Sequence, residues 1–136
     1  MQGIIDMQNM KAAVRSVLSN YATFSGRASR PEFWWWILAI FLLGFLIQLL
    51  DAFIVAPMLG FEPSDKNAGQ PLSLIFSLAI LIPAIAVAVR RLHDTGKSGW
   101  WLLLSFVPIL GTLILLWFYT RPSDGPNDWG APNPLR

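Results

Sequence analysis

Residues 33–50 have the sequence FWWWILAIFLLGFLIQLL, eighteen positions without a charged side chain. At 1.5 Å per residue, a helix of that length spans about 27 Å, close to the roughly 30 Å thickness of the hydrocarbon core of a bilayer. Trp34, Trp35 and Trp36 stand at its start, and indole rings favour the membrane–water interface. The stretch therefore predicts a membrane helix over residues 33–55.

Two further uncharged stretches predict two more membrane helices, over residues 71–89 and 98–120. Pro108 and Gly111 interrupt the third of these. A single kinked span is the simpler arrangement. A re-entrant hairpin that turns at Pro108 to Gly111 is the alternative, and it would place the tail, residues 121–136, on the other side of the membrane.

Pro83 lies inside the second stretch. Because proline has no backbone N–H, it should leave the carbonyl of Ala79 without its helical donor and bend the helix. Such kinks persist in membranes where another group donates to the carbonyl, and the hydroxyls of Ser73 and Ser77 are candidate donors.

The spacing of apolar residues over residues 7–24 predicts an amphipathic helix. Spacings of three and four place the following residues on one face: Met7, Met10, Val14, Val17, Leu18, Tyr21 and Phe24. Such a helix can lie in the headgroup layer with its apolar side down, or pack against the membrane helices of its own chain. After it, Ser29 and Glu32 have the spacing of a capping box, so a new helix should begin there.

Composition supports a membrane environment. Apolar residues make up 54% of the chain and charged residues 13%, against about 25% charged in ordinary soluble domains. The net charge of +2 is too small and too scattered to predict a nucleic-acid surface. The absence of cysteine excludes disulfides and thiol chemistry.

Lysine and arginine predict the orientation, because cytoplasmic segments of membrane proteins are enriched in them. With three spans, one side holds Lys11, Arg15, Arg27, Arg30, Arg90, Arg91 and Lys97. The other side holds Lys66, Arg121 and Arg136. This asymmetry predicts a cytoplasmic N-terminus and an exposed tail, residues 121–136, outside the cytoplasm.

The charged residues near the predicted cytoplasmic interface are the candidate contacts for a lipid headgroup or a protein partner. They are Arg27, Arg30, Glu32, Arg90, Arg91, His93, Asp94 and Lys97. The simpler interpretation is that the bases set the topology and reach toward the interface. The sharper one is a pocket in which guanidinium groups hold an anionic headgroup. We also expect Glu32 to pair with Arg91 and tie the loop to the start of the first membrane helix.

No catalytic or metal set is visible. Gly96-Lys97-Ser98 lacks the earlier glycine and the preceding strand that a phosphate-binding loop requires. The adjacent His93 and Asp94 have Ser98 and Thr95 as nearby hydroxyls, but a structural role in a turn is the better expectation. One histidine and no cysteine do not make a preformed metal site. We therefore expect neither an enzyme nor a cofactor.

Three motifs resemble those of a family of small bacterial inner-membrane proteins, domain of unknown function 805. The opening motif runs from Phe24 to Trp34, the central one from Arg90 to Trp101, and the closing one from Gly125 to Gly130. The closing motif departs mildly, with Trp129 where tyrosine is usual. The resemblance covers roughly residues 21–134 and implies a bacterial plasma-membrane protein. It supplies no reaction.

Together these observations predict a single all-α membrane domain, residues 1–136, with three transmembrane helices and an N-terminal amphipathic interfacial helix. A non-enzymatic, partner-binding or accessory role is the leading hypothesis. The alternative is an anionic-lipid-interacting or small transport-related protein that uses the arginine cluster, although no ionisable residue lies at mid-membrane depth. The expected partners are the bilayer, with an anionic phospholipid, another membrane protein or a second copy as candidates, and no nucleic acid.

Overall fold

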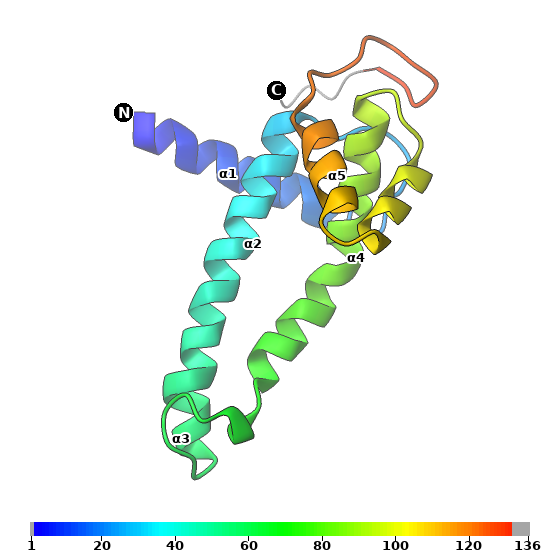
Figure 1. The fold of residues 1–136 in the computed structure, drawn as a ribbon. Coiled ribbons are helices and arrows are strands. Elements are labelled where there is room, and N and C mark those ends of the chain that lie inside the picture. The colour runs from blue at the N-terminus through cyan, green and yellow to red at the C-terminus, as the bar shows by residue number, and fades with distance from the viewer. Residues whose placement is uncertain (1, 132–136) are drawn as a thin grey trace.

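The computed structural model describes the backbone of residues 2–131 and the side chains of residues 8–131. Two long antiparallel helices form its body, α2 (Arg30–Leu50) and α4 (Pro71–Asp94), and a loop joins them at one end (Figure 1). The remaining elements gather around the other end. The expectation of an all-helical fold is confirmed for the described chain, whose one β-bridge, between Asn127 and Gly130, is isolated.

The first long helix begins where the capping box predicts. Ser29 is its N-cap and accepts a hydrogen bond from the backbone N–H of Glu32 at 3.4 Å. Helical structure continues beyond α2 through a π-helical turn, Asp51–Val55, into α3 (Ala56–Met58). The prediction of a helix over 33–55 is therefore confirmed, and the observed helix is longer at both ends.

Asp51 joins the two long helices at their far end. Its buried carboxylate accepts the backbone N–H groups of Leu72 at 3.0 Å and Ser73 at 2.7 Å. These donors belong to the first turn of α4, where helical partners are missing and the helix dipole favours negative charge. Asp51, the residue directly after α2, thus caps α4 across the intervening loop.

The second long helix runs five residues further than predicted, to Asp94, and contains Pro83. The hydroxyl of Tyr21 donates to the carbonyl of Ala79, the group that Pro83 deprives of its donor. Our expectation that Ser73 or Ser77 would do so is wrong. The Ser73 hydroxyl is buried beside the carboxylate of Asp51 instead.

The N-terminal helix α1 is Gln2–Ser19, so the predicted range of 7–24 begins and ends too late. It packs against the α2–α4 pair through Ala13 and Val17, which are fully buried. Leu18, Tyr21 and Phe24 are exposed, the last two in the turn that follows the helix. Of the two placements, packing on the chain's own helices accounts for the buried face. The side chain of Met7 lies outside the described residues.

The predicted single helix over residues 98–120 is wrong. The segment is a hairpin of a 3-10 helix, η3 (Gly99–Phe106), and an α-helix, α5 (Leu110–Thr120). Ile109 forms the turn with a φ of 64°, and the N–H of Leu110 donates to the carbonyl of Pro108 at 2.7 Å. This is a γ-turn, a strained conformation for a β-branched residue.

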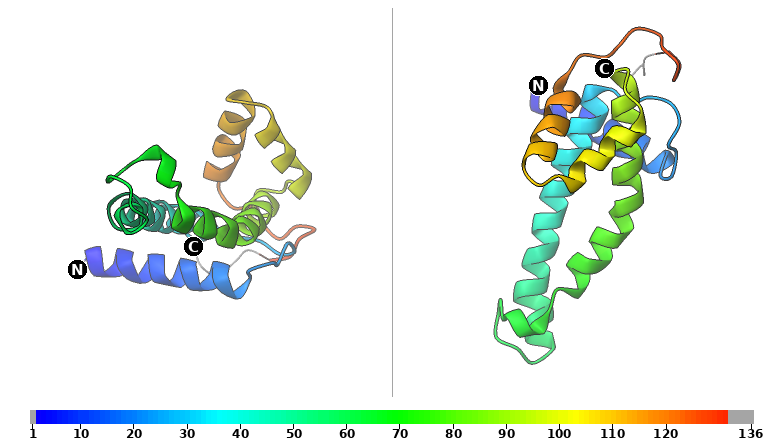
Figure 2. Two further views of the ribbon diagram at one scale, coloured as in Figure 1. Left: turned by 90° about the horizontal axis from the view of Figure 1, so that it is seen from below. Right: turned by 45° about the vertical axis from the view of Figure 1, so that its right-hand side comes forward.

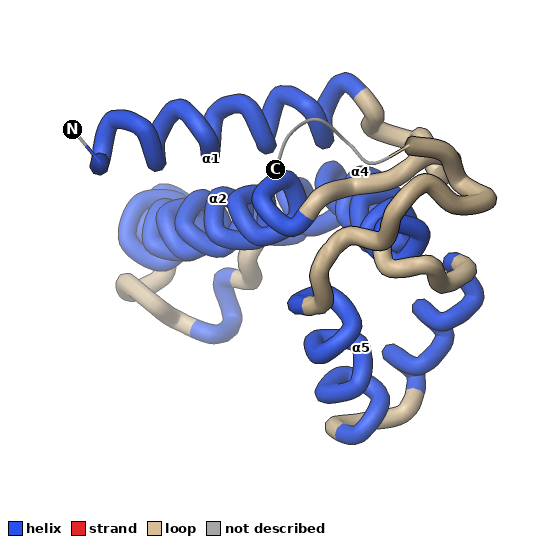
Figure 3. Tube along the Cα trace, turned by 90° about the horizontal axis from the view of Figure 1, so that it is seen from above, coloured by secondary structure: helices blue, strands red, loops and turns tan. Residues whose placement is uncertain are grey.

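Gly111 explains why the chain can fold back at this point. A Cβ atom there would lie 1.7 Å from the carbonyl oxygen of Leu104, so only glycine allows the two arms to approach. Figures 2 and 3 show α1 on one face of the α2–α4 pair and the hairpin on the other. The chain therefore returns to the end of the molecule it left, with the turn inside the range Pro108 to Gly111 that the alternative predicted.

Within residues 2–131, two helical stretches are long and apolar enough to cross a bilayer, Arg30–Met58 and Pro71–Asp94. The apolar helix α5 is shorter, with 11 residues. Three spans are thus not found in the described chain. Many of the large apolar side chains of the two long helices are exposed, among them Phe41, Phe45, Leu46, Phe53, Leu74, Ile75 and Leu78. This exposure suits a lipid environment.

Candidate functional site

A buried cluster of charges lies where the N-terminal part of α2 meets the C-terminal end of α4. Its centre is Asp94, whose side chain is completely buried. The Nε of Arg27 donates to Oδ1 of Asp94 at 3.0 Å, and an amino group of Arg91 donates to Oδ2 at 2.6 Å. Arg91 and Asp94 come together because residues three apart share one face of a helix. One carboxylate therefore holds two guanidinium groups.

Arg27 binds the segment that follows α5. Its terminal amino groups donate to the carbonyls of Asp124 at 2.5 Å, Gly125 at 2.7 Å and Gly130 at 3.0 Å. A further bond reaches the carbonyl of Asp94 at 3.2 Å. Together with the bond to the carboxylate, these contacts use all five N–H donors of the guanidinium.

The expected exposed tail is therefore folded back over the cluster as far as the structure describes it, through residue 131. The backbone N–H of Asp124 also donates to the carbonyl of Asp94 at 2.7 Å. Because Arg27 precedes α2 and the tail contacts it directly, the tail lies at the same end of the molecule as the N-terminal segment. The predicted placement of these two segments on opposite sides of the membrane stays a prediction, which these contacts do not support. Residues 132–136 lie outside the described part.

Arg91 holds the end of α5 in the same way. Its Nε donates to the carbonyl of Tyr119 at 3.0 Å, and its amino groups reach the carbonyls of Arg121 and Ala28. Burial raises the pKa of the Tyr119 phenol to about 12. The hydroxyl of Ser123 adds a bond to Oδ2 of Asp94 at 2.5 Å.

Glu32 and Arg90 form a second buried ion pair, 3.0 Å apart. The hydroxyl of Ser16 in α1 donates to the same carboxylate oxygen at 2.7 Å. The expected pairing of Glu32 with Arg91 is therefore wrong: consecutive residues of a helix point about 100° apart, and Arg90 is the one that faces α2. Two nitrogens of Arg90, Nε and one amino group, are buried without a hydrogen-bond partner in the described chain.

His93 has structural contacts. Its Nδ1 lies 2.9 Å from the carbonyl oxygen of Gly26, and its ring stacks on Trp129 with centroids 4.7 Å apart. Since a carbonyl only accepts, Nδ1 must carry the proton. Asn127 donates to the carbonyl of His93 at 3.0 Å, which fastens the tail a second time. These contacts fasten the last helical turn of α4 to the segment before α2 and to the tail.

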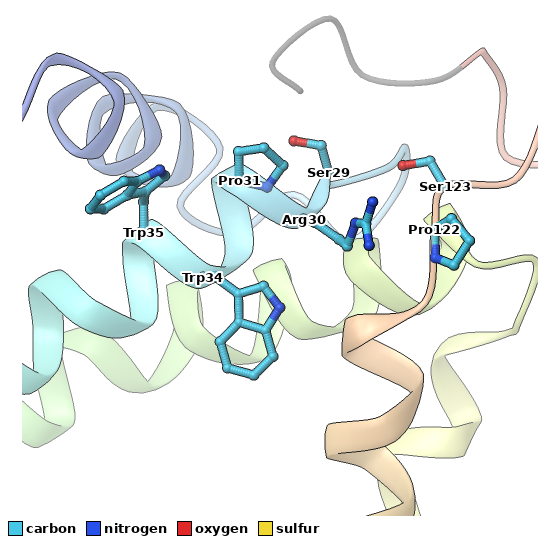
Figure 4. A pocket seen from close by; sticks show the side chains of 7 residues that line it. All are labelled: Ser29, Arg30, Pro31, Trp34, Trp35, Pro122 and Ser123. Carbon is cyan, nitrogen blue, oxygen red and sulfur yellow. The ribbon is translucent and has the colours of Figure 1, made fainter. Parts of the chain in front are cut away.

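Lys97 and Arg30 lie at the edge of the cluster. Lys97 is 4.5 Å from the centre of the Phe118 ring. Arg30 is exposed and donates to the carbonyl of Thr120 at 3.3 Å. It lines a pocket of about 460 Å³ between the start of α2 and the tail (Figure 4). The other lining residues are Ser29, Pro31, Trp34, Trp35, Pro122 and Ser123.

The structure therefore buries six of the eight candidate residues near the place where α2 and α4 meet, and leaves Arg30 and Lys97 at the edge of this cluster. Sequence reasoning missed Ser16, Ser123 and Asn127, which complete it. Asn127 was visible in the closing motif, but its role as a clamp on His93 was not. Among the described side chains, no three His, Asp or Glu residues come together in a way that could hold a metal ion.

The central motif of α4 and the opening and closing motifs thus meet in one place. Residues 21–131 match a family described as protein of unknown function, DUF805. The chain belongs to this family.

Its relatives include inner membrane protein YhaI of Escherichia coli strain K12, 42% identical over 116 residues, which are 85% of this chain and 89% of YhaI. Inner membrane protein YhaH of the same strain is 39% identical over 120 residues, covering 87% of this chain and 92% of YhaH. The uncharacterized protein YiiR is 35% identical over 86 residues, 62% of this chain and 50% of YiiR. No solved structure matches the chain.

Proposed function

We propose that this DUF805 protein is an integral protein of the bacterial inner membrane that binds another membrane-embedded protein and catalyses no reaction. Its membrane location is supported by the names of its relatives YhaI and YhaH and by the two apolar helices of spanning length. Its role is supported by the way the buried charges are used.

The observation that carries the proposal is that the charged groups around Asp94 bond to other groups of the same chain. The Asp94 carboxylate accepts hydrogen bonds from two arginines and a serine, and all the N–H donors of Arg27 bond to groups of this chain. A catalytic or ligand-binding group needs a free face toward its substrate. The cluster instead fastens the tail and α5 onto α2 and α4, so its chemistry is that of assembly.

The binding surface in this proposal is the exposed apolar shaft of α2. In lipid, helices associate through close packing and through polar side chains that bond across the interface. Gln48 is exposed on this shaft, with no side-chain hydrogen bond in the described chain, and lies one turn after Gly44. An amide in this position can bond to a polar group of a neighbouring membrane helix.

Topology follows from the returning tail and the basic residues. With two spans, Arg121 joins the basic side, and Lys66 becomes the one basic residue in residues 2–131 on the other side. Under the positive-inside rule this favours a cytoplasmic location for the N-terminal segment, the hairpin ends and the tail alike.

A photoreactive amino acid at Phe41, which is 72% exposed, tests the proposal in intact membranes. We expect one discrete protein adduct, whose yield falls when Gln48→Leu is added. Gln8→Leu, the same change on α1, is the matched control and should leave the yield unchanged. Adducts with lipid alone, or a protein adduct indifferent to Gln48→Leu, would refute this role.

The alternative, an anionic-lipid site built from Arg27, Arg30, Arg90 and Arg91, has less support. Three of these side chains are buried and engaged inside the protein. Arg30 alone among them is exposed and faces a pocket. A transport role has no supporting contact among the described residues.

A further inference from the structure

A groove of about 770 Å³ runs between α1 and α2. Its apolar lining comes from Met10, Val14 and Leu18 of α1 and from Ala39 of α2. This volume lies within the range of ordinary small-molecule sites, which is about 300 to 1,000 Å³. The groove is distinct from the buried arginine cluster and from the exposed shaft around Gln48.

The position of the groove along α2 corresponds to the depth of the acyl chains of one leaflet. Where α1 crosses α2, Ser16 contacts Glu32 and Val17 is buried. Ala39 lies almost two turns of helix beyond Glu32, on the side toward the uncharged shaft of α2. The groove therefore opens along the flank of α1 that faces the hydrocarbon of a bilayer.

Two basic residues border this apolar groove. Lys11 and Arg15 are exposed, and their spacing of four places them on one edge of α1. Neither forms a salt bridge within the described chain, and no acidic side chain lines the groove. The surface thus combines an apolar slot with two unpaired cations at its rim.

We propose that this groove holds an anionic phospholipid, with an acyl chain against Met10, Val14 and Leu18 and the phosphate between Lys11 and Arg15. An arginine and a lysine are the side chains that hold phosphate oxygens. A phospholipid can contact both the apolar lining and the two cations. A free phosphate would contact the cations but not the apolar lining, and a purely apolar helix would contact the lining but not the cations. The proposal does not depend on the partner-binding role.

Retention of lipid by the full-length protein in mild detergent, measured by native mass spectrometry, tests the charged half. The probes are phosphatidylglycerol, phosphatidylcholine with the same acyl chains, and glycerol phosphate. We expect phosphatidylglycerol to be retained in preference to the other two. Lys11→Gln/Arg15→Gln should weaken its binding by about 30-fold, the effect of two cations near an anionic lipid. Lys66→Gln/Arg121→Gln removes the same charge elsewhere and should have no effect.

The apolar half has its own test. Ala39→Trp fills the groove while leaving both cations in place, and it should also abolish retention of phosphatidylglycerol. Leu38→Trp adds the same ring at the neighbouring exposed position and should retain the lipid. Wild-type binding by either groove variant overturns the proposal. So does equal binding of glycerol phosphate, which would mean a site for free phosphate, and so does equal binding of phosphatidylcholine.

Discussion

The hydroxyl of Tyr21 donates a hydrogen bond to the backbone carbonyl of Ala79, which Pro83 leaves without its helical N–H. The donor comes from the turn after α1, 58 residues earlier in the chain. A proline kink in an apolar helix is thus stabilised by the phenol of a separate element. The same bond fixes α1 against the middle of α4.

Removing this hydroxyl should destabilise the protein modestly. We expect Tyr21→Phe to lower the free energy of unfolding in detergent by about 1 kcal/mol, because the carbonyl of Ala79 loses its donor. Pro83→Ala restores an N–H four residues after Ala79, so Tyr21→Phe should cost much less in that background. A double-mutant cycle by chemical unfolding measures the coupling, and additivity would contradict the assignment.

Asp94 should be the least replaceable charge. Asp94→Asn leaves Arg27 and Arg91 buried without their anion, which costs about 3 to 5 kcal/mol. We expect loss of the folded protein's peak on size-exclusion chromatography after extraction. Asp128→Asn, the same change at an exposed residue of the tail, should behave like wild type. A stable Asp94→Asn protein would show that the cluster does not hold the fold.

The pairing of Glu32 with Arg90 can be separated from pairing with Arg91. Glu32→Gln and Arg90→Gln should be coupled by about 2 kcal/mol, because each removes the same buried contact. Glu32→Gln and Arg91→Gln should be nearly additive, since Arg91 bonds to Asp94. Unfolding of the three single and two double variants in detergent measures both couplings. The reverse order of couplings would restore the pairing that the sequence suggested.

The hairpin should depend on Gly111. A methyl group there would overlap the carbonyl of Leu104, so Gly111→Ala should cost about 3 kcal/mol and separate the two arms. Protease sensitivity of the tail reports the separation, because the tail is held by contacts at the end of α5. Gly125→Ala is the control, since a Cβ atom there meets nothing within 4 Å. Equal protection of both variants would argue against the hairpin.

Topology is accessible through single cysteines, because the natural chain has none. In spheroplasts, a membrane-impermeant thiol reagent should label Lys66→Cys at once. It should label Ser25→Cys and Asp128→Cys after the membrane is opened, because the tail and the N-terminal segment share one side. Labelling of Asp128→Cys in sealed spheroplasts would indicate that residues 98–120 span the membrane.

The sequence predicted the features that depend on local physics. The uncharged run of α2, its cap at Ser29 and the break at Pro108 to Gly111 all come from residues close together in the chain. The choice between a span and a hairpin remained open because it depends on one close approach, of Gly111 to Leu104. The partner of Glu32 depends on the rotation of α4, which periodicity does not give to within one residue.

The route of the tail was beyond sequence reasoning for a further reason. Proline, glycine and asparagine predict an exposed segment, and only the buried guanidinium groups reveal that its carbonyls are used. Arginines beside a membrane helix are usually expected to reach for water or headgroups. Here Arg27 and Arg91 donate to backbone carbonyls instead. Every residue has such a carbonyl, so the sequence does not show which ones accept.

The arginine cluster has a consequence for biosynthesis. Arg27 and Arg91 leave the ribosome well before residues 119–130, which supply most of their backbone acceptors. During translation, α2 and α4 can enter the bilayer while these two guanidinium groups are still solvated. The cluster closes only after the downstream segment has been made. A nascent chain interrupted before that point would present these two arginines at the membrane surface with Asp94 but without those backbone acceptors.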